Sequence, residues 1–256
     1  MMTQTQKAQA FAALHRPGDP VILFNAWDAG SAKAVAEAGA TAIATGSWSV
    51  AAANGFGDGE GLPLDLAIAI AARIVAAVDL PVTLDFEGGY AVDPRRVCEN
   101  FGLALAAGVI GCNFEDRVVG GEGLHPIAAQ AARVEALRRA AERAGVPAFI
   151  NARTDIFLGS KPETHDRAAA DHALERARAY ADAGASGFFV PGLADEGLLA
   201  RICEASPLPV NAMMFAGMPS RRRLAELGVA RISHGPGPYR QAMAVLTEAA
   251  RAAFQG

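Results

Sequence analysis

The residues of this chain best suited to chemistry are two acids at the end of an apolar run. Within PVTLDFEGGY, residues 81–90, Asp85 and Glu87 lie two positions apart. Side chains two apart on a strand point to the same face of a sheet, so the two acids could share one cation. The alternative is that they only open a solvated turn at the glycines that follow. This segment alone favours neither reading, so the rest of the chain must decide between them.

Polar residues recur at the ends of the other apolar runs, whereas the interiors of those runs stay apolar. Acids follow four of the runs, and clustered carboxylates repel one another unless a cation or shared protons neutralise them. Oxygen ligands favour Mg²⁺ or Mn²⁺, and the five histidines lack the paired spacing of a zinc site. The residues expected at this common face are Asn25, Asp28, Thr45, Gly46, Ser47, Asp85, Glu87, Asn113, Glu115, Asp116, Asn151, Arg153, Asp155, Asn211, Ser233 and His234.

Two interpretations stay open for several of these residues. Arg153 could form an internal salt bridge with a neighbouring acid, or it could grip a substrate carboxylate or phosphoryl group, which we favour. Thr45, Gly46 and Ser47 could present backbone N–H groups to an anionic ligand, or they could only begin a loop. His234 could act as a general base or serve as a hydrogen-bond partner within its loop.

Eight strand-like runs, alternating with alanine-rich segments of helical periodicity, must position these residues. Near-continuous apolar character is typical of parallel strands covered on both faces. Eight such units predict an α/β fold of the (β/α)8 TIM-barrel type, with its active site at the carboxyl ends of the strands. The predicted strands are 21–28, 41–48, 81–88, 109–116, 148–155, 187–192, 209–214 and 231–236, and the predicted helices are 64–78, 94–107, 128–144, 166–183, 195–205 and 220–227.

The composition fits one barrel domain over residues 1–256, led by a short amphipathic helix. The net charge of −4 with interspersed signs gives no footprint for nucleic acid or a membrane surface. No apolar run reaches the ~20 residues of a membrane helix, and the polar start lacks the apolar centre of a signal peptide. Three widely spaced cysteines read as reduced thiols, so we expect a cytoplasmic protein. No lysine falls at a strand end, which argues against a Schiff-base aldolase.

Three segments are longer than ordinary connections between a strand and a helix: 47–63, 117–126 and 158–166. The first two are rich in glycine, and the first carries Asp58 and Glu60. Long loops in a compact domain are usually functional or mobile. All three would lie at the face where barrel active sites form.

The series NAWDAGSAKAVAEAGATAIATGS, DFEGGY, NFEDR, NART and LPVNAM resembles the isocitrate lyase/phosphoenolpyruvate mutase superfamily, in the family's order from about residue 25 to 240. It is closest to the short members called phosphoenolpyruvate phosphonomutase-like. The resemblance implies a (β/α)8 barrel that binds Mg²⁺ and an α-keto or enolpyruvyl carboxylate. It also implies that a C–C or C–P bond is made or broken through an enolate-type intermediate, and that the chain assembles as a homodimer or homotetramer.

The resemblance assigns a metal site to the acids. Asp85 matches the first acid of the family's D-x-D-x-G-Y-G motif and would be the principal Mg²⁺ ligand, with Mn²⁺ as the other candidate ion. Glu87 takes the place of the second acid, the glycine and tyrosine that follow match, and an alanine replaces the last glycine. Glu115, in NFED, matches the acid that reaches the metal, usually through water.

The resemblance also assigns residues to the substrate. Asp58 matches an acid in the family's loop after the second strand, and the turn 45–47 matches the one that holds the substrate carboxylate. Arg153 matches the arginine that grips the anionic group of the substrate. Asn211 lies where a polar residue of the seventh strand approaches the ligand, and Ser233 is expected to face the same space.

The loop after the fourth predicted strand departs from the family pattern. Lyases of the family carry K-[KR]-C-G-H there, with the cysteine as acid/base, whereas residues 117–125 read RVVGGEGLH. This loop has neither cysteine nor lysine, and Cys112 belongs to the strand itself, so isocitrate or methylisocitrate cleavage is not expected. Metal-bound water, Tyr90 and His125 are the candidate proton donors.

Together these residues predict a Mg²⁺-dependent enzyme of lyase type that acts on a small α-keto or enolpyruvyl carboxylic acid through an enolate. The bond change would be C–C cleavage, decarboxylation or hydrolysis. One alternative is phosphonate chemistry, of the phosphoenolpyruvate mutase or C–P hydrolase type. Another, from a different class, is a catalytically silent barrel that binds a metabolite. Loss of the cysteine loop motivates this last alternative, and retention of the acids argues against it.

Overall fold

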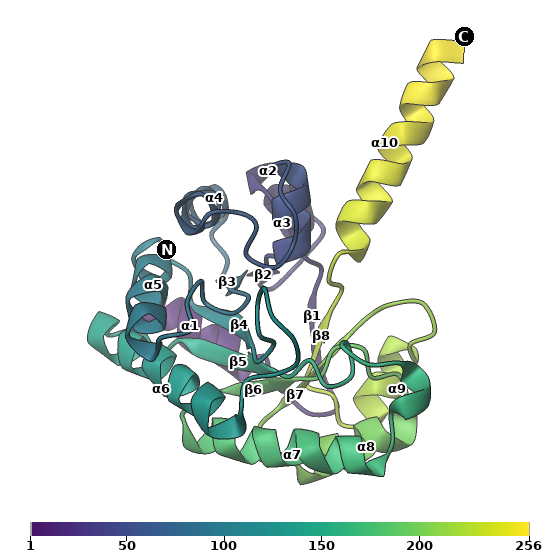
Figure 1. Ribbon diagram of the computed structural model, residues 1–256. Helices are drawn as coiled ribbons and strands as arrows, with labels where there is room; N and C mark the ends of the chain where they lie inside the picture. The colour runs from purple at the N-terminus through teal and green to yellow at the C-terminus, as the bar shows by residue number, and fades with distance from the viewer. Residues whose placement is uncertain (1, 256) are drawn as a thin grey trace.

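In the computed structural model, which describes residues 2–255, eight parallel strands form a nearly closed barrel (Figure 1). Pairing runs from β1 through β8, β7, β6, β5, β4 and β3 to β2. Among the described residues, one isolated bridge, between Ala26 and Thr45, joins the segments that follow β1 and β2. The predicted (β/α)8 TIM-type barrel is therefore confirmed. The strands are β1 (Val21–Leu23), β2 (Ile43–Ala44), β3 (Val82–Asp85), β4 (Gly111–Glu115), β5 (Phe149–Arg153), β6 (Gly187–Phe189), β7 (Val210–Met213) and β8 (Arg231–Ser233).

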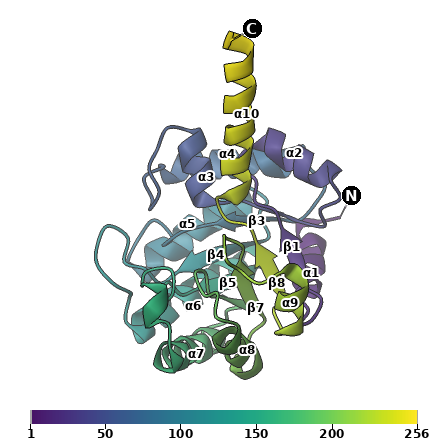
Figure 2. The ribbon, with the colours of Figure 1, turned by 90° about the vertical axis from the view of Figure 1, so that its right-hand side faces the viewer.

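Helices alternate with these strands, and most of them surround the barrel (Figure 2). The six predicted helices are confirmed to within one residue at each end, and the leading helix is α1. The predicted loop 47–63 begins with a short helix, α3. The helices are α1 (Gln4–Ala13), α2 (Ala29–Glu37), α3 (Ser47–Ala53), α4 (Leu64–Ala77), α5 (Pro94–Ala106), α6 (Ile127–Ala144), α7 (Arg167–Asp182), α8 (Glu196–Ala205), α9 (Arg221–Glu226) and α10 (Gly237–Gln255), with a 3-10 turn η1 (Pro162–Thr164).

Side-chain caps fix where several helices begin, and one of them corrects the sequence analysis. Asp28, expected among the acids of the active face, is the N-cap of α2 and accepts a hydrogen bond from Ser31 N–H at 2.7 Å. An N-cap carboxylate satisfies N–H groups that the first helical turn leaves without a partner. The acid after the first strand therefore serves the helix rather than the cluster.

The strands end earlier than predicted because side chains take over at their carboxyl ends. β1 stops at Leu23, and Asn25 then crosses the seam of the barrel. Its amide nitrogen donates to the Thr45 carbonyl at 2.8 Å, and its oxygen accepts the N–H groups of His234 and Gly235, both at 2.9 Å. This one buried amide joins the ends of β1, β2 and β8, where strand pairing is weakest.

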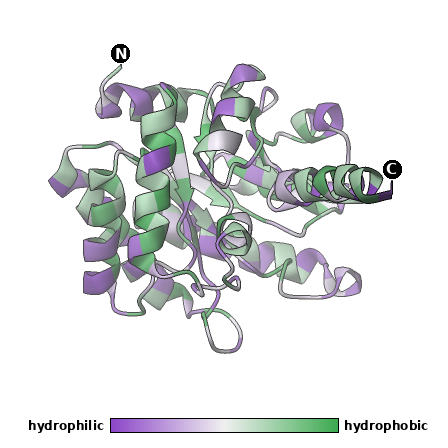
Figure 3. Ribbon diagram, turned by 90° about the horizontal axis from the view of Figure 1, so that it is seen from above, coloured by the Kyte–Doolittle hydropathy of each residue, from purple (hydrophilic) through white to green (hydrophobic). Residues whose placement is uncertain are grey.

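The last helix, α10, leaves the barrel instead of packing on it (Figures 1 and 2). Pro238 is the one residue that its described range buries. Val245, Leu246 and Phe254 are 65%, 61% and 88% exposed, and Figure 3 shows hydrophobic residues along this helix. No helix within residues 2–255 combines the length and the apolar character that crossing a membrane requires.

A close approach between β4 and β5 gives a test of the barrel packing. A Cβ on Gly111 would lie 2.3 Å from the carbonyl oxygen of Phe149. Main chain cannot move aside as a flexible side chain can, so Gly111→Ala should lower the free energy of unfolding in urea by about 3 kcal/mol. Gly102→Ala in α5, where nothing lies within 4 Å, is the control and should be neutral or slightly stabilising. Equal effects of the two substitutions would contradict this account.

Candidate active site

A cavity of about 350 Å³ opens at the carboxyl ends of the strands, where the sequence predicts the active site. Its walls come from the segments that follow β2, β3, β4 and β5. Thr45, Asp85 and Tyr90 line an adjoining space that shares Ser47 and Glu87 with it. The lining residues of the cavity are Ser47, Asp58, Gly59, Glu87, Glu115, Arg117, Val119, Gly120, Arg153 and Leu158.

Asp85, the last residue of β3, is held by the residues that follow β2. Its main-chain N–H donates to Thr45 Oγ1, and its Oδ2 accepts from Ser47 N–H, both at 2.9 Å. The N–H of Gly46 donates to a main-chain carbonyl. The N–H of Thr45 likewise donates to the Thr83 carbonyl, so the turn 45–47, which was expected to offer N–H groups to a substrate, uses all three within the protein. The Ser47 hydroxyl, 3.4 Å from Asp58 Oδ1, is the group it offers to the cavity.

The turn after β3 adopts a backbone that non-glycine residues avoid. Glu87 and Tyr90 have φ values of 49° and 58°, and Glu60, which contacts both, has a φ of 60°. Glu60 N–H donates to Glu87 Oε2 at 2.6 Å, and Glu60 Oε1 accepts from Tyr90 N–H at 2.7 Å. Such conformations persist only where the surroundings hold them, and they gather at functional sites. These contacts fasten the loop that carries Asp58 to the turn that carries Glu87.

Arg133 of α6 holds the same turn from the helix side, a role that the sequence analysis missed. Its buried guanidinium donates to the carbonyls of Gly88 and Ala91 and lies 4.9 Å from the ring centroid of Phe114. The sequence contained one indication of this role: the helical periodicity places position 133 on the buried face of its helix. Periodicity does not say which carbonyl a buried arginine will meet.

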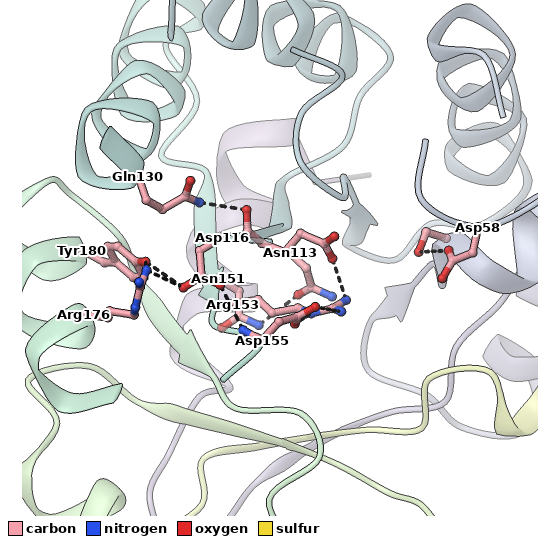
Figure 4. Close-up of polar contacts among 11 residues, drawn as sticks. Asp58, Asn113, Asp116, Gln130, Asn151, Arg153, Asp155, Arg176 and Tyr180 are labelled. Carbon is pink, nitrogen blue, oxygen red and sulfur yellow. Dashed lines mark hydrogen bonds and ion pairs between the residues drawn. The ribbon is translucent and has the colours of Figure 1, made fainter. Parts of the chain in front are cut away.

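Arg153 forms the internal salt bridges that the sequence left open, and it also lines the cavity (Figure 4). Its Nη1 lies 2.9 Å from Glu115 Oε2, and its Nε and Nη2 lie 2.5 and 2.8 Å from the two oxygens of Asp155. Burial opposes the charge of Arg153, but the two carboxylates outweigh it and raise the pKa of Arg153. The cavity therefore holds a fixed positive charge on its wall.

Asp116, expected at the mouth, faces away from the cavity (Figure 4). It is fully buried and accepts from Arg176 Nη1 at 3.0 Å, from the Tyr180 hydroxyl at 2.9 Å and from Asp155 N–H at 3.0 Å. Successive residues of a strand point to opposite faces, so Glu115 meets the cavity and Asp116 meets α7. This acid joins β4 and β5 to α7, and the sequence-based placement was wrong.

Three other predicted site residues lie outside the lining of the cavity. Ser233 Oγ lies 3.2 Å from Asn211 Oδ1, and both side chains are buried in the barrel. His125 is also buried, its N–H donates to the Asp116 carbonyl, and burial lowers the pKa of its ring. Tyr90 is better placed, because its hydroxyl lies 3.4 Å from Glu87 Oε1.

A second buried arginine, also unpredicted, lies in the barrel interior. Arg231 of β8 is fully buried and donates through Nη2 to Asn113 Oδ1 at 2.9 Å, and the same oxygen accepts from Asn151 Nδ2. Burial lowers the pKa of Arg231 to about 9, against the attraction of Asp85. Asn113 and Asn151, expected at the mouth, thus form a polar layer inside the barrel.

The acids carry more negative charge than the neighbouring arginine offsets. Burial above all, together with Asp85 and Asp58 and against the N–H of Glu60, raises the pKa of Glu87 to about 7. Burial and then Asp85 raise the pKa of Asp58 as well. A cation would relieve this repulsion.

The residues present fit a magnesium ion, although they do not enclose one. Within residues 2–255, no three acidic, histidine or cysteine side chains converge as a preformed set of metal ligands. Mg²⁺ usually keeps several waters and takes only one or two protein carboxylates, so it needs no such cage. Asp85, Glu87 and Glu115, which line the two adjoining spaces, are the carboxylates that would hold the ion.

Comparison with known proteins gives one family. A family model described as phosphoenolpyruvate phosphomutase matches residues 11–254. The chain is similar to a candidate phosphonomutase from Burkholderia cenocepacia J2315, with 53% identity and a TM-score of 0.96 over 98% of this chain and 99% of that one. A 2,3-dimethylmalate lyase is 25% identical, with a TM-score of 0.83 over 98% and 84% of the two chains. A phosphonopyruvate hydrolase crystallised with oxalate and Mg²⁺ is 20% identical, with a TM-score of 0.83 over 96% and 85%, and so shows the shared fold.

The raised pKa of Glu87 predicts a pH-dependent stability. The folded protein keeps a proton that the unfolded chain releases between pH 4.5 and about 7, so the metal-free protein should lose stability as the pH rises through this window. Glu87 should account for up to about 3 kcal/mol of this loss in the free energy of unfolding. Urea unfolding with a chelator at several pH values measures it. Glu87→Gln should flatten the slope and the exposed control Glu135→Gln should not; an unchanged slope in Glu87→Gln would contradict the assignment.

Proposed function

The chain belongs to the phosphoenolpyruvate phosphomutase family, and from this premise we propose that it is a Mg²⁺-dependent lyase. Its substrate would be a small α-keto or enolpyruvyl carboxylic acid, and its reaction C–C cleavage, decarboxylation or hydrolysis through an enolate. The observation that carries the proposal is the excess of carboxylates at the mouth of the barrel, where the buried Glu87 and Glu115 and the less buried Asp85 and Asp58 lie around one arginine. Such repulsion costs free energy in the folded protein unless a cation offsets it.

Each group of the cavity has a role in this proposal. Asp85 would hold the cation, which when bound supplies Lewis-acid stabilisation of negative charge on a carbonyl oxygen. The Ser47 hydroxyl, beside Asp58, orients the substrate carboxylate. Arg153, fixed by Asp155, stabilises the anionic group at the other end of the substrate.

Tyr90 and Glu87 are the best placed groups for proton transfer. The Tyr90 hydroxyl lies 3.4 Å from Glu87 Oε1, and burial raises the pKa of Tyr90, so the phenol stays protonated at neutral pH. Glu87, whose carboxylate lies beside this hydroxyl, is the partner that would accept or return its proton. This pair offers a route to a proton where the loop 117–125 has no cysteine.

Phosphonate chemistry is the second candidate, favoured by the 53% identity to a candidate phosphonomutase. The acids and Arg153 would serve it equally well, because both reactions stabilise a similar enolate. A silent metabolite-binding barrel is the third, and the retained acid set argues against it. Turnover assays distinguish the three candidates: turnover of α-keto acids supports the lyase, turnover of phosphonates supports phosphonate chemistry, and turnover of neither supports the silent barrel.

Calorimetry with Mg²⁺ and oxalate tests the site, because oxalate resembles the enolate of pyruvate in charge and shape. Oxalate should bind only when Mg²⁺ is present, and Asp85→Ala should weaken Mg²⁺ binding by at least about tenfold through loss of the main ligand. The exposed Asp182→Ala at the end of α7 is the matched control. Unchanged Mg²⁺ affinity in Asp85→Ala would refute the site. Pyruvate release from oxaloacetate is assayed in parallel. Metal-dependent binding without turnover of any α-keto acid or phosphonate tested would favour the silent barrel.

We propose further that the chain forms a homodimer or homotetramer through α10. Each helix of a (β/α)8 barrel normally covers the sheet beside its strand, but α10 projects away. A groove of about 440 Å³, lined by Leu14, Ile22 and Phe24 among others, lies beside β1. A second copy of the chain, with an equally exposed α10, would supply an apolar partner of matching character.

Charges placed on α10 test this assembly. Val245→Glu with Leu246→Glu should reduce the molar mass measured by light scattering to that of one chain, because a desolvated carboxylate opposes apolar burial. Gln241→Glu with Thr247→Glu adds the same two charges at exposed polar positions and should leave the mass unchanged. A monomeric unmodified protein would contradict the proposal outright.

The compartment we propose is the cytoplasm. Cys98, Cys112 and Cys203 are free thiols. Burial raises the pKa of Cys112 and Cys203, Cys203 to about 12, so these two are protonated and unreactive at neutral pH. Free thiols that the fold keeps inert suit a reducing environment.

A further inference from the structure

A mainly apolar hollow of about 530 Å³ lies beside the acidic cavity. Its walls come from the loop after β5, the end of β7 and the start of α10. Leu158, Met213, Met214 and Phe215 supply most of its apolar character, and Arg240 is its one arginine. Leu158 and Phe215 are 45% and 39% exposed, so large apolar surface faces solvent here.

The hollow is continuous with the candidate active site. Leu158 lines both spaces. Met213 packs closely against Gly235: a Cβ placed on Gly235 would lie 2.7 Å from the sulfur of Met213. Gly235 in turn lies close to Gly46, because a Cβ placed on Gly46 would lie 3.6 Å from the carbonyl oxygen of Gly235. A short series of contacts thus runs from the hollow to the turn 45–47. A ligand anchored at that turn can extend over Leu158 without leaving the protein surface.

The chemistry of the two spaces is complementary. The acidic cavity holds carboxylates and Arg153, whereas the hollow holds thioethers, an aromatic ring and aliphatic side chains. Arg240 stacks on Trp48 with 4.6 Å to the ring centroid, so its stem and the indole extend the apolar surface toward Ser47. Ligand sites typically combine such apolar walls with a few polar groups that fix orientation.

We propose that the hollow binds an apolar arm of the substrate, an alkyl or aryl group carried beyond the α-keto carboxylate. This inference rests on the function proposed above and narrows it to acids longer than pyruvate or oxaloacetate. Methionine-rich walls adapt to arms of different shape. We infer a small molecule as the occupant because the hollow shares a wall, Leu158, with the candidate active site.

The test measures binding of a homologous series by calorimetry in the presence of Mg²⁺: oxalate, pyruvate, 2-oxobutanoate, 2-oxopentanoate and 2-oxohexanoate. Each methylene buried should tighten binding by about threefold to fourfold, so the longest acid should bind at least about tenfold more tightly than pyruvate. Ala216→Trp, at an exposed lining position, should remove this gain by filling the hollow and leave oxalate binding unchanged.

Two further variants keep the result interpretable if Ala216→Trp folds poorly. Phe215→Gln should reduce the gain from chain length, whereas Leu103→Gln, at an exposed apolar residue on α5, should not. If oxalate binds but the affinity of the longer acids does not depend on chain length, the proposal of an apolar substrate arm is wrong while the proposed function stands. A structure in which α10 of a second copy fills the hollow would have the same meaning. If the unmodified protein does not bind oxalate in the presence of Mg²⁺, both the proposed function and the apolar substrate arm are wrong.

Discussion

Repulsion among buried carboxylates is the interaction on which the arrangement of this barrel depends. Parallel strands deliver Asp85, Glu87 and Glu115 to one end of the sheet, where little water remains to screen them. Arg153 offsets part of this charge but shares its guanidinium between Glu115 and Asp155. Burial, with repulsion from Asp85 added to it, raises the pKa values of Glu87 and Asp58. Protons or a cation must complete the balance, so the electrostatics that strain the fold also define what it can bind.

Holding these acids together requires support from outside the strands. Left-handed backbone at Glu87 and Tyr90 is unfavourable by itself, and it is fastened by Glu60 from one side and Arg133 from the other. Strain of this kind persists only when surrounding contacts over-determine it. The same contacts tie the loop carrying Asp58 to the turn carrying Glu87. The geometry of the acids is therefore a property of three segments, not of β3 alone.

The sequence predicted this barrel well because helix boundaries follow local rules, and caps such as Asp195 and Ser220 obey them, whereas Asp28, also a cap, was misplaced among the acids. It also placed Asp85, Glu87, Glu115 and Arg153 at one face, since strand ends in a parallel barrel share one rim. It misplaced Asp116 because a rim position does not reveal to which side of the sheet a residue points, and that side depends on where α7 packs. Arg133 and Arg231 were missed for a related reason: their partners are carbonyl and amide oxygens far away in the chain.

The division between strands and loops explains how one rim can serve several reactions. The strand ends fix the carboxylates, which attract a cation, and Arg153, which attracts an anion. The segments that follow them, such as 117–125 and 158–166, supply the remaining walls, and these differ in chemistry from the acids they surround. Leu158 belongs to the walls of two spaces, one charged and one apolar, so a change in that loop alters what fits beside the rim without disturbing the charges on it. The strand ends accordingly set the charges at the rim, and the loops set the shape and polarity of the spaces beside it.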